Sequence, residues 1–245
     1  MLSAPDLTSR VIRHERLIVA AGIALLVGLS WWFLVSGAGM ESHMAMPGMA
    51  PPPLTALVLM WWLMMVAMML PSAAPAVLLY ARVRHTRGAD VDVAQSWVFV
   101  AGYLAVWLFF SILAASLQQL LAGPSMALEN PTLASVLLIV AGLYQLSPFK
   151  GACLRECRSP AQFLSRHWRP GATGAVRLGI IHGAYCVGCC WLLMALLFVG
   201  GVMNFAWIAA LTVVVGIEKL VPRGDWVGRA LGAALIAWGI ARLAT

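Results

Sequence analysis

The sequence predicts an all-α fold: a bundle of seven transmembrane helices forming a single integral membrane domain over residues 1–245. Hydrophobic residues make up 62% of the chain and charged residues only 10%. The apolar residues form runs of about 20, the length needed to cross the hydrocarbon core of a bilayer. With a mean hydropathy of +0.89, a soluble domain could not keep so much apolar surface away from water. The composition therefore excludes a soluble catalytic domain.

The apolar runs place the expected helices at 17–36, 54–81, 97–121, 132–149, 178–199, 202–221 and 226–243. The first run lacks a small-residue cleavage site, which distinguishes it from a signal peptide. The second contains Pro71 and Pro75, which predict a kink or a division into two parts. Charged residues crowd the ends of the last two runs, so their boundaries are the least well defined.

The basic residues predict how the helices are oriented. Cytoplasmic loops of membrane proteins carry an excess of Lys and Arg. If the N-terminus is cytoplasmic, every Lys and Arg except Arg242 falls on the cytoplasmic side. We therefore expect a multi-pass protein of the bacterial inner membrane with a periplasmic C-terminus. Basic residues scattered between apolar runs form no soluble basic face, which argues against nucleic acid as a partner.

The largest expected cytoplasmic loop, 150–177, contains a signal for one short helix. In "SPAQFLSRHW", Ser159 stands at an N-cap position and Pro160 at the first helical position. This pattern predicts a helix lying on the inner membrane surface.

A cysteine cluster stands out at 181–191, "IHGAYCVGCCW". At 100° per residue, a helix places His182, Cys186, Cys189 and Cys190 on one face. Spacings of three and four residues bring such side chains close enough for two of them to chelate one ion. Because one straight helix rarely supplies four ligands to one metal, we expect further ligands from other segments.

The expected further ligands are Cys153 and Cys157 in "KGACLRECRSP", near the inner end of the fourth span. The fifth span begins on the same side, so these thiols and the cluster belong to one half of the protein. In the cytosol thiols stay reduced, and paired cysteines indicate metal binding or catalysis more often than a structural disulfide. Packing is the alternative: Cys behaves as a small hydrophobe, an interpretation strongest for Cys190, and Gly179 and Gly183 indicate close helix contacts.

Methionine is the second candidate ligand type. The outer loop "GMESHMAMPGMAPPP" is methionine-rich and carries Met40, His43, Met44, Met46 and Met49. In the second span, one stripe contains Met60, Met64 and Met68, and the next contains Met65 and Met69. Thioethers and thiolates select soft ions, above all Cu(I), which makes Met64 and Met68 candidate ligands. The alternative for the helix is ordinary core packing. The depth order suggests a hypothesis in which thioethers capture an ion and pass it to the thiols.

Glu218, near the inner end of the sixth span, is expected at a depth similar to that of His182. It is a candidate ligand, or an acceptor that fixes the imidazole tautomer. The alternative is an ion pair with Lys219 or Arg223, or a side chain that extends to the interface. Weaker candidates for lining a polar pocket are Tyr144 and Gln145.

Three motifs occur in order: "WWLMMVAMMLPSAAP", "YQLSPFKGACLRECRSP", and "HGAYCVGCCWLLMALLFVGGVMN" followed by "IEKLVP". Together they resemble the signatures of bacterial predicted metal-binding integral membrane proteins, a family labelled as a domain of unknown function. The resemblance covers residues 54–222. It implies metal ligands at Cys153, Cys157, His182, Cys186, Cys189 and Cys190, with Glu218 as a further polar position.

Three functions follow from these observations. The first is soft-metal binding, with copper as Cu(I) ahead of zinc, in transport or in delivery to a cuproprotein; its partners are the bilayer, the ion and a cuproprotein or metallochaperone. The second is a membrane thiol-disulfide oxidoreductase using the C-x-x-C of Cys186 and Cys189. The expected cytoplasmic position of the cluster argues against this enzyme, so binding ranks above catalysis. The third is a structural or assembly subunit whose cysteines only pack.

Overall fold

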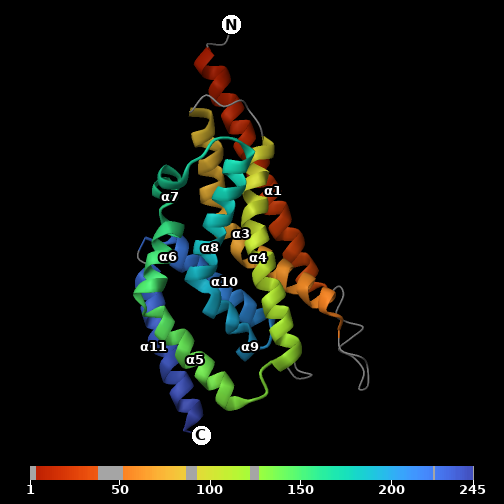
Figure 1. Cartoon of the computed structure of the whole chain (residues 1–245), viewed down its shortest axis with the longest axis vertical. Helices are drawn as coiled ribbons and strands as arrows, with labels where there is room; N and C mark the ends of the chain where they lie inside the picture. Colours follow the sequence, from red (N-terminus) through yellow and green to blue (C-terminus); the bar gives the residue numbers. More distant parts are fainter. Residues whose placement is uncertain (1–3, 38–51, 87–92, 122–126, 223, 245) are drawn as a thin grey trace.

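The computed structural model describes residues 4–37, 52–86, 93–121, 127–222 and 224–244. The regular elements of this part of the chain are helices (Figure 1). In chain order they are α1 (Ala4–Val35), α3 (Leu54–Thr86), α4 (Val93–Leu121), α5 (Pro131–Gln145), α6 (Pro148–Arg158), α7 (Pro160–His167), α8 (Gly171–Ala195), α9 (Leu197–Gly200), α10 (Phe205–Leu220) and α11 (Gly224–Leu243). The prediction of an all-helical chain is confirmed for these residues.

Several of these helices are long and apolar enough to span a membrane. The five that qualify singly are His14–Val35, Leu54–Arg84, Val93–Leu120, Gly171–Gly200 and Gly224–Leu243. The pair α5 and α6, bent by 62° at its break, makes a sixth if it is counted as one span. Helix α10 has 16 residues. Five or six spans are thus supported, and the seventh span and the orientation stay predictions.

The fourth expected span differs from the structure at its inner end. We expected it to continue to residue 149, but α5 ends at Gln145 and α6 begins at Pro148. The local sequence explains the break, because Pro148 occupies the start of α6 and the Ser147 hydroxyl accepts a hydrogen bond from the Lys150 backbone N–H at 3.2 Å. The polar residues of α6 are thereby turned away from the axis of α5.

Two other local predictions concern proline. The short helix expected after Ser159 is present as α7, although the Ser159 side chain makes no capping hydrogen bond. Helix α3 is continuous through Pro71 and Pro75, and its ribbon changes direction about midway along its length (Figure 1). The expected kink is therefore present without a division into two helices.

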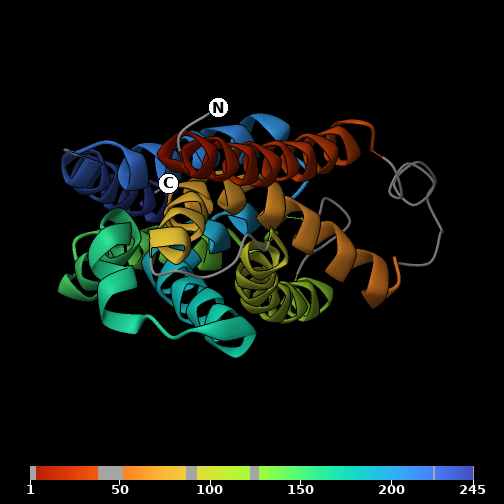
Figure 2. The same ribbon diagram turned by 90° about the horizontal axis from the view of Figure 1, so that it is seen from above.

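Helix α3 lies at the centre of the bundle and contacts α1, α4, α7 and α10. Seen from above, it runs between α1 on one side and α4 and α8 on the other (Figure 2). Helix α8 packs closely along α4, and α6 lies against α8. Helices α5 and α11 form a separate antiparallel pair (Figure 1). The cysteine-bearing helix α8 is thus held between α4 and α6.

Glycine sets the close approach of α4 and α8. A Cβ atom placed on Gly179 would lie only 2.1 Å from the Phe99 carbonyl oxygen, and one on Gly102 would lie 2.5 Å from the Val176 carbonyl oxygen. Only residues without a side chain allow two helix backbones to approach this closely. Gly179 therefore determines where α8 presents its cysteines.

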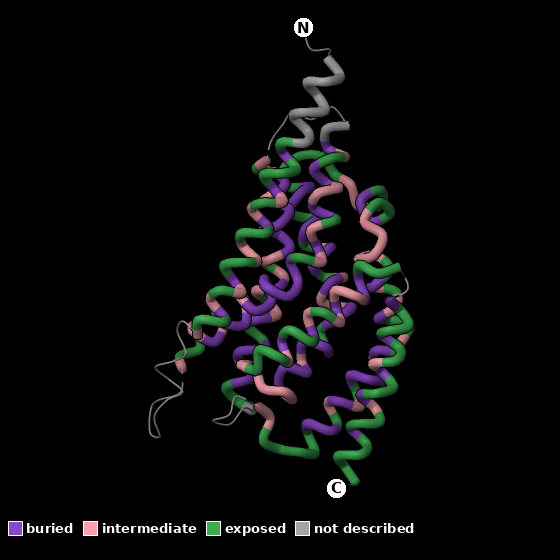
Figure 3. Tube along the Cα trace, turned by 180° about the vertical axis from the view of Figure 1, so that it is seen from behind, coloured by how far each residue is buried: buried purple, intermediate pink, exposed green. Residues whose placement is uncertain are grey.

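The core and the outer surface are both apolar. Buried residues face the interior of the bundle and exposed residues face outward (Figure 3). Large apolar side chains such as Trp32, Phe109 and Leu120 are exposed. Outward apolar surface on this scale is typical of helices that contact lipid.

Candidate metal centre

The sulfur-bearing side chains come from three helices and gather around α8. Helix α3 supplies Met69, α6 supplies Cys153 and Cys157, and α8 supplies Cys186, Cys189 and Cys190. All five cysteines are free thiols, and the three on α8 are each 1% exposed. We describe two neighbouring groups: the inner sulfur group (Met69, Cys186 and Cys190) and the outer sulfur group (Cys153, Cys157 and Cys189).

The inner sulfur group surrounds the amino group of Lys219, which α10 brings to it. The Lys219 Nζ atom lies 2.9 Å from Cys186 Sγ and 3.9 Å from Cys190 Sγ. It is also 3.8 Å from Met69 Sδ and 3.4 Å from Ser72 Oγ. Lys219 is buried. A buried cation therefore occupies a point on which three sulfur atoms converge.

Direct contacts within the inner sulfur group connect α3 and α4 to α8. Cys190 Sγ lies 3.8 Å from Met69 Sδ. The buried hydroxyl of Tyr103, on α4, donates to the Met69 carbonyl oxygen at 3.1 Å and lies 3.0 Å from Cys186 Sγ. Because Tyr103 contacts both neighbouring helices, it positions Met69 relative to Cys186.

The outer sulfur group lies where α6 packs against α8. Cys157 Sγ is 4.0 Å from Cys189 Sγ. The Cys153 thiol packs against the backbone of Gly188, because a Cβ atom added at Gly188 would lie 2.9 Å from Cys153 Sγ. Both cysteines of α6 are half-buried. The structure thus brings the second cysteine pair beside the α8 cluster, as the sequence suggested.

His182 lies one turn before Cys186 and is buried. Its Nδ1 atom has no hydrogen-bond partner among the described residues. The surrounding rings are those of Phe163, Tyr103 and Phe99, with centroids 4.9, 5.9 and 6.1 Å from that of the imidazole. A buried ring nitrogen without a partner is costly in a resting structure, so His182 stays a candidate ligand.

Glu218 takes partners that we did not expect. Its carboxylate accepts from Lys150 Nζ at 2.5 Å and from Gln145 Nε2 at 2.6 Å, and Lys150 also donates to the Gln145 side-chain oxygen. All three side chains are buried. The ion pair with Lys219 that was the alternative to a ligand role is not formed, because Lys219 faces the inner sulfur group instead; Arg223 lies outside the described residues. We call Lys150, Gln145 and Glu218 the polar network.

The methionines divide into those near the thiols and those in the core. Met64 and Met68 are fully buried in the core, whereas the contact with Cys190 and Lys219 is made by Met69, from the neighbouring stripe. A role for Met64 and Met68 as ligands stays a prediction. The methionines of the outer loop and His43 lie outside the described residues.

Sequence reasoning did not identify Lys219 and Tyr103 as parts of this site. A signal for each was available. An ionisable residue inside an apolar span is costly and commonly functional, and a buried tyrosine requires a partner for its hydroxyl. Lys219 was considered only as one possible ion-pair partner of its neighbour Glu218.

The donor set fits a soft, low-coordinate ion. Among the described residues, no three His, Cys, Asp or Glu side chains form a group that could hold a metal ion. The inner sulfur group combines one thioether, of Met69, with the thiols of Cys186 and Cys190, and this combination suits Cu(I). Structural zinc prefers four ligands in tetrahedral geometry, which these three sulfur atoms do not supply.

A family model named PpoB2 and described as a copper chaperone matches residues 58–242. This region includes both sulfur groups and the polar network. No curated protein and no solved structure matches the chain.

Proposed function

The chain belongs to the PpoB2 copper chaperone family, and from this premise we propose that it binds Cu(I) at the inner sulfur group, inside a membrane helix bundle. The observation that carries the proposal is the position of the Lys219 amino group, within 3.9 Å of Cys186, Cys190 and Met69 sulfur atoms. A point that holds one monovalent cation against three sulfur atoms suits another monovalent cation that binds sulfur more strongly.

Charge balance supports a copper ion at this point. Thiols that coordinate a metal are deprotonated, so Cu(I) held by Cys186 and Cys190 leaves a net charge of minus one. The Lys219 ammonium offsets that charge without leaving the neighbourhood. Its flexible side chain can withdraw from the centre and stay close enough to interact. His182, with its unpartnered Nδ1, is the nearby candidate for an additional ligand.

The outer sulfur group gives the ion a route to another protein. Cys189 is adjacent in sequence to Cys190 and lies 4.0 Å, between sulfur atoms, from Cys157. The half-buried Cys153 and Cys157 are the most accessible thiols of the set. We propose that copper moves from the inner to the outer group by exchange of sulfur ligands and passes to a cuproprotein or metallochaperone at α6.

We further propose that the protein resides in the bacterial inner membrane with seven spans, a cytoplasmic N-terminus and a periplasmic C-terminus. This topology adds two spans to the five helices that qualify singly. One is α5 with the start of α6, and the other is α10. The support is the distribution of Lys and Arg, which excludes only Arg242 from the cytoplasmic side. In this orientation α6 and the outer sulfur group face the cytoplasm.

The proposed function is tested by the copper content of the detergent-purified protein after Cu(I) loading and removal of excess ion. We expect about one copper per chain in the wild type, because the inner sulfur group is a single site. The double variant Cys186→Ser, Cys190→Ser is expected to retain none. The matched control, Cys153→Ser, Cys157→Ser, removes two thiols outside the inner group and is expected to retain its copper.

Two results would contradict this assignment. Equal copper in the wild type and both variants would mean that no thiol of this cluster binds the ion. Loss of copper only in the Cys153→Ser, Cys157→Ser variant would move the site to the outer sulfur group.

A thiol-disulfide oxidoreductase is the second candidate function, favoured by the 4.0 Å separation of the Cys157 and Cys189 sulfur atoms. A small movement of α6 would allow a disulfide between them, and thiol exchange could then pass electrons to a partner. Counting free thiols after equilibration in thiol-disulfide buffers tests this function. Formation of a Cys157–Cys189 disulfide at cytosolic redox potentials would favour it, and five free thiols would favour the copper site.

A further inference from the structure

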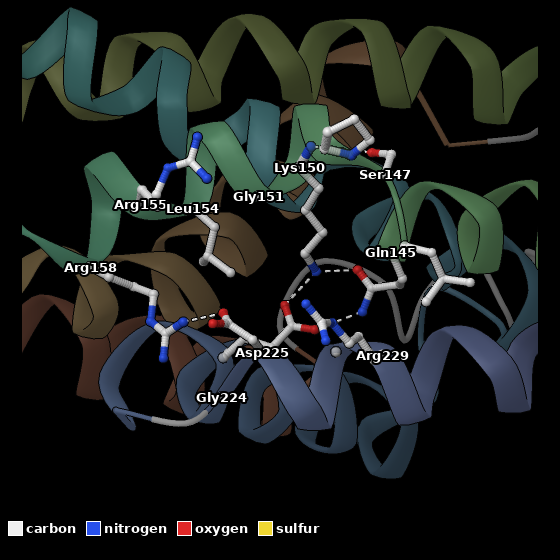
Figure 4. Close-up of a pocket in the computed structure, with 14 residues that line it drawn as sticks. Gln145, Ser147, Lys150, Gly151, Leu154, Arg155, Arg158, Gly224, Asp225 and Arg229 are labelled. Atoms are coloured by element: carbon white, nitrogen blue, oxygen red, sulfur yellow. Dashed lines mark hydrogen bonds and ion pairs between the residues drawn. The ribbon is translucent and has the colours of Figure 1, made fainter.

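A second polar site lies at the level where three apolar helices end. Helix α5 ends at Gln145, α10 ends at Leu220 and α11 begins at Gly224, with α6 crossing beside them. These ends enclose a pocket of about 520 Å³. Figure 4 shows the pocket and its polar side chains. We call it the arginine pocket, and its charged lining residues are Lys150, Arg155, Arg158, Glu218, Asp225 and Arg229.

The arginine pocket has two positive charges more than its carboxylates neutralise. Glu218 pairs with Lys150, and Asp225 pairs with Arg158. Arg155 and Arg229 have no carboxylate partner in the part of the chain that the structure describes. The Arg229 guanidinium lies over the Trp226 ring, 5.6 Å from its centroid.

The positive side chains approach the pocket from both ends. In Figure 4, Arg155 and Arg158 lie toward one end, and Lys150 and Arg229 lie toward the other. Guanidinium groups bind phosphate and carboxylate oxygens through paired, charge-assisted hydrogen bonds. The pocket therefore offers an anionic ligand uncompensated positive charge toward each end.

The surroundings of the pocket are apolar and exposed. Phe149 and Trp226, which stand next to lining residues in the chain, are 75% and 70% exposed, and the lining residue Leu146 is 49% exposed. Exposed tryptophan at a helix end is typical of the boundary between hydrocarbon and headgroups. A small soluble anion would make no contact with these apolar side chains, whereas the acyl chains of a lipid would pack against them.

We propose that the arginine pocket binds the phosphate group of an anionic phospholipid, with the acyl chains against Phe149, Leu146 and Trp226. Arg155 and Arg229, at opposite ends of the pocket, supply the uncompensated positive charge that attracts the headgroup, and the polar network forms part of the pocket lining. Basic pockets between membrane helices are known to hold anionic headgroups. The same phosphate chemistry has a second source, free inorganic phosphate, which the test distinguishes. This site is independent of the copper site.

Native mass spectrometry of the full chain in detergent tests the proposal, with phosphatidylglycerol, phosphatidylcholine and inorganic phosphate titrated separately. We expect the wild type to retain phosphatidylglycerol in preference to phosphatidylcholine. The variant Arg155→Gln, Arg229→Gln is expected to lose about tenfold in affinity for phosphatidylglycerol, the effect of removing charge-assisted hydrogen bonds. The variant Arg155→Lys, Arg229→Lys keeps the charge and is expected to bind with an intermediate affinity.

The matched control is Arg169→Gln, Arg177→Gln, which removes the same charge from two exposed arginines outside the pocket. It is expected to bind phosphatidylglycerol like the wild type. Binding of inorganic phosphate that depends on Arg155 and Arg229, without binding of lipid, would assign the pocket to the free anion. Equal retention of phosphatidylglycerol in the wild type and the Arg155→Gln, Arg229→Gln variant would overturn the proposal, as would an equal loss in the control.

Discussion

The polar network contains one buried lysine, Lys150, and the inner sulfur group surrounds another, Lys219. The two lysines differ in the groups that offset their charge. In the polar network, Lys150 faces a full carboxylate charge at 2.5 Å and also donates to the Gln145 oxygen. In the inner sulfur group, the contacts of Lys219 are three sulfur atoms and the Ser72 hydroxyl. Neutral thiols and thioethers are weak acceptors, so Lys219 is much less well compensated than Lys150.

Glu218 and Lys219 are adjacent in α10 but contact different parts of the protein. Glu218 neutralises a lysine of α6, while Lys219 leaves its neighbour and extends to the thiols of α8. A buried charge without a strong partner is costly and is seldom retained for stability alone. We therefore interpret the polar network as stabilising the fold, and Lys219 as part of the proposed copper site.

The largest effect is expected when the polar network is broken. Lys150→Met leaves the Glu218 carboxylate buried without its cation, and removal of one partner of a buried pair costs about 3–5 kcal/mol. Thermal unfolding in detergent measures the change. The control Arg166→Met breaks the exposed pair with Glu156 and is expected to cost less than about 1 kcal/mol. Similar losses in both variants would remove the distinction between the polar network and a surface pair.

The next effect concerns the contact that positions α8 and its thiols. Gly179→Ala would place a methyl group 2.1 Å from the Phe99 carbonyl oxygen, so α8 must move away from α4 at a cost of about 1–3 kcal/mol. The matched change Gly216→Ala meets no atom within 4 Å and is expected to be neutral or stabilising by up to about 1 kcal/mol. The unfolding temperatures of both variants in detergent are measured and compared with that of the wild type. A neutral Gly179→Ala would show that the close contact does not position α8.

The third prediction distinguishes the two methionine stripes. Met69→Leu removes one of three sulfur atoms around the proposed copper position, and we expect a loss of about tenfold in Cu(I) affinity. Met64→Leu keeps the core filled at a position outside the inner sulfur group and is expected to change the affinity less than about twofold. Competition with a chromophoric Cu(I) chelator measures both. The reverse order would assign the ion to the stripe of Met64 and Met68.

The smallest expected effect is on the second lysine. Lys219→Met replaces a buried cation that has only weak acceptors by a neutral chain of similar volume, and such replacements are often neutral or stabilising. We expect the copper-free variant to unfold within about 1 kcal/mol of the wild type, or above it. If Lys219→Met cost as much as Lys150→Met, the contrast between the two lysines would be wrong.

Much of the fold could be predicted because it depends on local patterns. Apolar runs locate the long helices, and the pair Ser159–Pro160 marks where α7 begins. The sharing of one face by Cys186, Cys189 and Cys190 follows from helix periodicity alone. Helix boundaries were less well predicted, since hydropathy does not register the bend after Gln145. Membership of a copper chaperone family is consistent with the expected metal-binding family and supports the expectation of copper, while each individual ligand stays a prediction.

The sequence by itself determined that the chain is helical and apolar, with its thiols gathered on one helix face and in the segment that follows the fourth expected span. Only the tertiary structure decided that Met69 rather than Met64 or Met68 contacts a thiol, that Glu218 pairs with Lys150, and that Lys219 lies among the sulfur atoms. The physical reason is that periodicity assigns residues to faces of one helix, whereas contacts between helices depend on the rotation and closeness of their packing. At Gly179 and Gly102, that closeness is set by two missing side chains, and Tyr103 then aligns the thiols with Met69.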